Sequence, residues 1–87
     1  MSNKNVFLKK YFLMTRSEEN YLKTIFHLGG GDSKSITTNA IAEQMETKPS
    51  SVTDMAKKLS EKGLVDYVRY QGVSLTAVGV KTALSII

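Results

Sequence analysis

The sequence predicts one α+β domain that is mainly α: a three-helix core, a β-hairpin and a C-terminal helix. Its 87 residues are enough for one hydrophobic core but not for two. Apolar residues recur at helical spacing in the segments before Gly63. The segment after Gly63 is rich in β-branched and aromatic residues and contains a Gln-Gly turn signal, which is typical of a hairpin.

The composition excludes several classes of protein. Hydrophobic residues make up 41% and charged residues 23% of the chain, which is ordinary for a globular domain. The absence of cysteine excludes disulfides and thiolate metal sites, and the single histidine, His27, excludes a two-histidine metal site. Gly29-Gly30-Gly31 lacks the Gly-Lys-Ser/Thr ending of a phosphate loop and is interpreted as a connector. We therefore do not expect an enzyme.

The sequence contains no candidate membrane segment. Its longest apolar stretch, Val6 to Met14, has nine residues and is interrupted by Lys9 and Lys10. A membrane span needs about 20 apolar residues. We therefore expect a soluble, cytoplasmic protein without a membrane partner.

The first helix is expected over residues 17–28, where apolar side chains occur with a period near 3.6. Either Thr15 or Ser17 can cap it. Glu18 and Glu19 fall in the first turn, where the helix dipole favours anions, and Thr15 with Glu18 has the spacing of a capping box.

A second, shorter helix is expected to end at Met45, with Thr37 or Thr38 as its cap. After a break of three or four residues, Pro49 suits the first turn of a third helix, and Gly63 is predicted as its C-cap. The third helix has an apolar face, and its other face is polar. The apolar positions are Val52, Met55, Ala56 and Leu59, and the polar ones are Ser50, Thr53, Asp54, Lys57 and Glu61. Two helices joined by so short a turn predict a helix-turn-helix.

A β-hairpin is expected next, with one strand over residues 64–70, a turn at Gln71-Gly72 and a second strand over residues 73–75. A hairpin after the second helix of a helix-turn-helix is a wing, so the complete pattern predicts a winged helix-turn-helix. Thr76 is expected to cap a last helix whose apolar side chains continue to the end of the chain. They would be left exposed unless more chain or a partner covers them.

Five segments in this order resemble the DNA-binding domain of the iron- and manganese-dependent repressors, the diphtheria toxin repressor family. The resemblance covers residues 17–87 and rests on Glu19-Asn20-Tyr21-Leu22-Lys23-Thr24-Ile25, Ile41-Ala42-Glu43, Pro49-Ser50-Ser51-Val52-Thr53, Glu61-Lys62-Gly63-Leu64-Val65 and Tyr70-Gln71-Gly72-Val73-Ser74-Leu75-Thr76.

The resemblance implies a homodimer that binds a palindromic operator in double-stranded DNA when Mn²⁺ or Fe²⁺ is bound, with the third helix in the major groove. By position it implies groove contacts for Lys48, Ser50 and Asp54. The phosphate contacts that it implies are Thr38, Ser51, Thr53, Lys57 and Lys58. At the hairpin tip we add Arg69 and Gln71. Asp54 either accepts from a cytosine amino group or pairs with a neighbouring lysine on the helix surface.

The resemblance also implies a metal site that this chain only partly contains. In the family most ligands come from a second, dimerisation domain after the fourth helix, and the first helix supplies an Asp or Met where this chain has Asn20. An amide oxygen is a weak, neutral ligand, tolerable for Mn²⁺ and poor for Fe²⁺. We therefore expect no metal bound by this chain.

Three segments follow from these observations. Residues 1–16 form an N-terminal extension, either helical or frayed, residues 17–75 form the winged helix-turn-helix, and residues 76–87 begin a linker helix towards the missing domain.

Net charge is +4 over residues 1–16, −3 over residues 17–46 and +3 over residues 47–87. Positive charge in the C-terminal half favours a polyanionic partner.

The leading hypothesis is a sequence-specific DNA-binding transcriptional regulator, the DNA-binding part of a Mn- or Fe-dependent repressor. The alternative is a winged helix that binds another protein and not DNA. Its contact surface would be formed by Tyr67, Tyr70 and the exposed side of the last helix.

Overall fold

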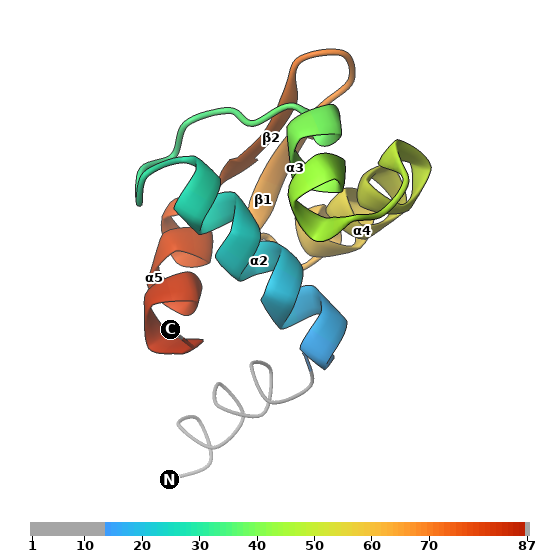
Figure 1. Cartoon of the computed structure of the whole chain (residues 1–87). Helices are drawn as coiled ribbons and strands as arrows, with labels where there is room; N and C mark the ends of the chain where they lie inside the picture. Colours follow the sequence, from blue (N-terminus) through green and yellow to red (C-terminus); the bar gives the residue numbers. More distant parts are fainter. Residues whose placement is uncertain (1–13, 87) are drawn as a thin grey trace, which may run out of the picture.

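The computed structural model shown in Figure 1 describes residues 14–86. Its elements are α2 (Arg16–Leu28), α3 (Thr38–Met45), α4 (Pro49–Glu61), β1 (Val65–Val68), β2 (Gly72–Leu75) and α5 (Ala77–Ile86). The predicted α+β, mainly helical class and the order of its elements are confirmed. Residues 1–13 of the expected N-terminal extension lie outside the described residues.

The helices and the hairpin enclose one hydrophobic core. α2 contacts α3, α4, α5 and β2, so it lies at the centre of the arrangement (Figure 1). Its side chains Leu22 and Ile25 are buried with Ile41 of α3 and Leu59 of α4. From the hairpin, Val65 and Val73 complete the core. Burial of these apolar side chains is the main favourable term that holds helices and hairpin together.

The starts of α2 and α3 are set by threonine caps. Thr15 Oγ1 accepts from the Glu18 N–H at 3.0 Å, and Glu18 Oε1 accepts from the Thr15 N–H at 2.8 Å, which completes the predicted capping box. α2 therefore begins at Arg16, one residue before the predicted start. In the same way, Thr37 Oγ1 accepts from the Ala40 N–H at 3.1 Å, so the cap of α3 is Thr37 and not Thr38.

The turn between α3 and α4 is short, as predicted. Glu46 ends α3 in the left-handed region at φ 54°, and the Thr47 N–H donates to the Ala42 carbonyl at 2.9 Å. Pro49 is the first residue of α4. At the other end Lys62 is the C-cap and Gly63, at φ 75°, follows it, so the predicted cap is displaced by one residue. Glycine tolerates this left-handed conformation without steric cost.

The hairpin has the predicted antiparallel pairing, but its turn lies elsewhere. Val65 pairs with Leu75 and Val68 with Gly72, so the first strand ends at Val68 and not at Tyr70. The turn comprises residues 69–71 and is closed by the Gln71 N–H, which donates to the Val68 carbonyl at 3.0 Å. Gly72, which pairs with Val68, is the first residue of the second strand, and a Cβ there would collide with the Ile36 carbonyl oxygen.

The connection between α2 and α3 also joins the hairpin, which the sequence did not predict. Ile36 forms an isolated antiparallel bridge with Val73. The Ile36 N–H donates to the Val73 carbonyl at 2.7 Å, and the Val73 N–H donates to the Ile36 carbonyl at 2.8 Å. Since α3 begins two residues after Ile36, this bridge fixes the hairpin relative to the helix-turn-helix.

The last helix, α5, is capped by Thr76, as predicted. Thr76 Oγ1 accepts from the Gly79 N–H at 3.0 Å and donates to the Gly63 carbonyl at 2.7 Å. The side of α5 that carries Gly79, Thr82 and Ala83 is buried, whereas Leu84 is 61% exposed. Within residues 14–86 no helix is long and apolar enough to cross a membrane.

Candidate nucleic-acid interface

The two faces of α4 differ in both burial and chemistry. Val52, Ala56 and Leu59 are buried in the core, as the helical period predicted. The outward face carries hydroxyl, lysine and aspartate side chains that are exposed to solvent. These are Ser50, Ser51, Asp54, Lys57 and Lys58. Anchoring one face in the core holds the other as a fixed, polar surface that can meet a partner.

The N-terminal end of α4 is open to an anion. Lys48 occupies the N-cap position and forms no side-chain capping hydrogen bond, and Pro49 follows it. Pro49 has no N–H and the Ser51 N–H donates to the Lys48 carbonyl at 3.0 Å, so the attraction for an anion comes mainly from the helix dipole, which gives this end a partial positive charge. With the exposed Lys48, Ser50 and Ser51 around it, this end suits a phosphate group.

The structure does not place all the predicted contact residues equally well. Lys48, Ser50, Ser51, Lys57 and Lys58 are exposed on α4 or at its start. Thr53 and Thr38 are half-buried, so less of each side chain is available to a ligand.

Asp54 is exposed on the same face of α4. In the described part of the chain it forms no salt bridge with Lys57 or Lys58. Both sequence interpretations of Asp54 therefore stay predictions. A second α4 carboxylate, Glu61, is exposed near the end of the helix.

The hairpin tip forms a second exposed surface, made of Arg69, Tyr70 and Gln71. The Arg69 guanidinium carbon lies 5.0 Å from the centre of the Tyr70 ring, in a cation–π contact. Ser35 Oγ donates to the Gln71 carbonyl at 3.3 Å, so the tip is braced by the α2–α3 connection. Tyr70 was not among the predicted nucleic-acid contacts.

Helix and hairpin are held at a fixed angle to each other. α4 packs on β1, and the Leu64 N–H donates to the Leu59 carbonyl at 3.0 Å where the chain leaves the helix. In Figure 1 the hairpin tip and the start of α4 both lie on the side of the molecule away from its C-terminal end. One partner can therefore meet both surfaces.

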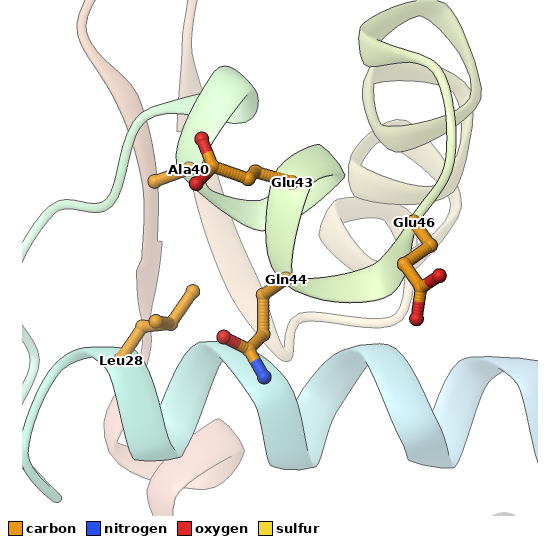
Figure 2. A pocket seen from close by; sticks show the side chains of 5 residues that line it. All are labelled: Leu28, Ala40, Glu43, Gln44 and Glu46. Atoms are coloured by element: carbon orange, nitrogen blue, oxygen red, sulfur yellow. The ribbon is translucent and has the colours of Figure 1, made fainter.

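A shallow pocket of about 450 Å³ lies between the end of α2 and α3 (Figure 2). Leu28 and Ala40 line it together with Glu43, Gln44 and Glu46. Two carboxylates at its wall would repel a polyanion. None of the predicted contact residues lies there, so this pocket is not part of the candidate interface.

The described residues do not fit a metal ion. Asn20, the one predicted ligand, is exposed on α2. Within residues 14–86 no group of three or more His, Cys, Asp or Glu side chains is placed to hold an ion.

A helix-turn-helix whose second helix presents a hydroxyl and lysine face, followed by a β-hairpin, defines a winged helix-turn-helix DNA-binding domain. The model of the iron-dependent repressor N-terminal DNA-binding domain matches residues 13–73. The chain belongs to this iron-dependent repressor family.

Similar proteins agree with this assignment. A helix-turn-helix transcriptional regulator of Methanocaldococcus jannaschii is 39% identical over 74 residues, covering 85% of this chain and 59% of that protein. The transcriptional regulator MntR of Oceanobacillus iheyensis is 41% identical over 68 residues, covering 77% of this chain and 45% of MntR. The crystal structure of ScaR with bound Zn²⁺ matches with a TM-score of 0.64 and 35% identity, over 79% of this chain and 31% of ScaR. The chain thus spans about half the length of the two regulators.

Proposed function

We propose that this chain binds double-stranded DNA through the exposed face of α4 and acts as the DNA-binding part of a metal-dependent transcriptional repressor. The observation that carries the proposal is the outward face of α4, where the Ser50 and Ser51 hydroxyls lie at the N-terminal end and Lys57 and Lys58 follow about two turns later. The family assignment supports the same function.

The dimensions of α4 and the major groove agree. An α-helix with its side chains is about 10–12 Å across, and the major groove of B-DNA is about 12 Å wide. With α4 in that groove, the exposed Ser50 and Asp54 face base edges, while Lys57 and Lys58 neutralise phosphates. Asp54 contributes specificity by accepting from a cytosine amino group.

Three further parts of the proposal concern the assembly, the metal dependence and the location of the protein. A single module of this size contacts one half-site and binds weakly, so we propose a homodimer on a palindromic operator. Dependence on Mn²⁺ or Fe²⁺ is proposed for the longer family members and not for the described residues of this chain, which hold no suitable ligand set. A transcriptional regulator must reach the DNA that it binds. We therefore propose a cytoplasmic location.

The test compares two double variants with the same change in net charge. Lys57→Glu with Lys58→Glu reverses two charges on α4, and Lys34→Glu with Lys81→Glu reverses two exposed charges elsewhere. Duplexes are selected from a random-sequence library with the full chain, and affinity is measured by fluorescence anisotropy. We expect the α4 variant to lose about a hundredfold or more, because two phosphate contacts become repulsive. The control should lose much less, and equal losses would contradict an interface on α4.

The same experiment addresses the alternative function, a protein-binding winged helix. Exposed Tyr70 and Leu84 are the observations that favour it. If the unmodified chain selects no duplex, DNA binding fails and the alternative gains support. The family assignment favours DNA binding.

A further inference from the structure

The chain before α2 carries a cationic, apolar segment that the proposed function does not use. Residues 1–13 contain three lysines and no aspartate or glutamate. Six of the eight residues from Val6 to Leu13 are apolar, and Lys9 and Lys10 are the other two. A segment of this composition suits a surface that combines apolar side chains with negative charge.

The described residues fix where this segment joins the domain. Thr15 is the N-cap of α2 and is extended, with φ −75° and ψ 161°, so the helix starts at Arg16. Met14, just before the cap, is buried in the hydrophobic core. The preceding chain therefore joins the domain beside α2, next to the helices that pack on α2.

Two surfaces on the helices beside α2 leave apolar side chains exposed. On α5, Leu84 is exposed on the same side as Lys81. Between α2 and α3, the pocket shown in Figure 2 is lined by exposed Leu28 together with Glu43 and Glu46. Within residues 14–86 neither of these carboxylates forms a salt bridge. A cationic segment is repelled by the lysine on α5 and attracted by the two carboxylates, so charge favours the pocket.

The pocket lies within reach of the segment. α2 has 13 residues and is therefore about 20 Å long. Leu28 is its last residue, and Glu46 lies back towards its start (Figure 2). An extended chain advances about 3.3 Å per residue, so the seven residues from Met14 back to Phe7 cover about 23 Å. Counted back from Met14, the two lysines come before Leu8 and Phe7, just as Glu46 comes before Leu28 along the pocket.

We propose that residues 1–13 fold back along α2 and occupy the pocket of the same chain. The contacts are apolar at one end of the pocket and ionic at the other: Phe7 and Leu8 on Leu28, and Lys9 and Lys10 on Glu43 and Glu46. Exposed ion pairs contribute little, so the apolar contact supplies most of the attraction and the charges select this pocket over α5. The chain's own segment is favoured over that of a second copy, because a short link gives it a high effective concentration.

The test places a nitroxide spin label in the segment. Asn5→Cys provides a single thiol for the label, since the chain has no cysteine. We expect the amide NMR signals of the pocket residues to lose intensity, and those of Lys81 and Leu84 on α5 to lose much less. Equal losses on both surfaces, or no loss at the pocket, would overturn the proposal.

Charge reversal identifies the pocket. Glu43→Lys with Glu46→Lys should largely abolish the intensity loss there, because attraction becomes repulsion. Glu61→Lys with Asp66→Lys makes the same change in net charge at exposed positions outside the pocket, so it should keep the loss. Adding Lys9→Glu and Lys10→Glu to the pocket variant should restore the loss, which separates a broken contact from a damaged fold. A pocket variant that keeps the loss contradicts the proposal.

A mixed sample distinguishes the chain's own segment from that of a second copy. Isotope-labelled chain without a spin label is mixed with spin-labelled chain that carries no isotope. We expect no intensity loss in this mixture. A loss at the pocket would show that a second copy occupies it, and the proposal of an intrachain contact would fall. None of these measurements uses DNA, so their outcome is independent of the proposed function.

Discussion

Lys62 Nζ, at the end of α4, lies 2.8 Å from Glu18 Oε1 in the first turn of α2. The same oxygen accepts the Thr15 N–H of the capping box. The Glu18 side chain is only 6% exposed and that of Lys62 is 39% exposed. One carboxylate therefore fixes the start of α2 and ties it to the end of the proposed DNA-reading helix.

Replacing this carboxylate should weaken the fold. Glu18→Gln keeps an oxygen that can accept from Thr15, but it loses the charge that attracts Lys62. Because Lys62 is partly solvated, we expect a loss of about 1 kcal/mol in the free energy of unfolding. Urea titration measures it. Glu19→Gln is the matched control, since it removes a charge from the same helix turn without removing a salt bridge among the described residues. An equal loss in both variants would assign the effect to the helix dipole.

The same pair predicts how stability depends on pH. Burial raises the pKa of the Glu18 carboxyl, but the hydrogen bond and charge of Lys62 and the hydrogen bonds from Thr15 outweigh it, so its pKa lies below the ordinary 4.5. A carboxyl with a lowered pKa stabilises the folded state fully above its unfolded pKa, and this contribution is lost as pH falls through the folded pKa. The difference in melting temperature between the unmodified chain and Glu18→Gln should therefore be constant above about pH 5 and shrink below pH 4.5. A difference that does not change down to pH 3 would show that Glu18 ionisation is not its source.

Gly79 should resist a substitution that normally stabilises a helix. Alanine is about 1 kcal/mol better than glycine inside a helix. At Gly79, however, a Cβ would collide with the Leu64 carbonyl oxygen, so α5 packs closely against the start of the hairpin. We expect Gly79→Ala to destabilise the chain by about 2 kcal/mol, the usual scale of overpacking.

Urea titration measures the Gly79→Ala effect. Val78→Ala, at the exposed neighbouring position, should change the free energy of unfolding by less than about 0.5 kcal/mol. A stabilised Gly79→Ala variant would mean that α5 does not approach Leu64 this closely.

The helices were predictable because their signals are local. Thr15 and Thr37 lie next to the first turns that they cap, and Pro49 stands at the first position of α4. The 3.6-residue period identified the buried face of α4, and with it the opposite, exposed face. Most of the candidate site on α4 could therefore be predicted from the sequence.

The features that escaped prediction depend on residues far apart in the chain. Gly72 lies against the Ile36 carbonyl, and the bridge from Ile36 to Val73 has no local signal. The Glu18–Lys62 pair joins residues 44 positions apart. The partial burial of Thr38 and Thr53 likewise follows from packing between elements. The place of Tyr70 in the turn also escaped prediction, because its aromatic side chain is typical of a strand.

Salt dependence should distinguish phosphate contacts from lysines that are only solvated. Each phosphate neutralised on duplex DNA contributes about −0.9 to the slope of log affinity against log salt concentration. We expect Lys57→Gln and Lys58→Gln each to make the slope shallower by about 0.9, and the double variant by about 1.8. Lys81→Gln, exposed on α5, should leave the slope unchanged. Anisotropy titrations at several salt concentrations on one selected duplex provide the slopes. If the Lys81 variant changes the slope as much as the α4 variants do, the DNA does not lie along α4. Phosphate contacts confined to the α4 face would leave the slope of a variant on α5 unchanged.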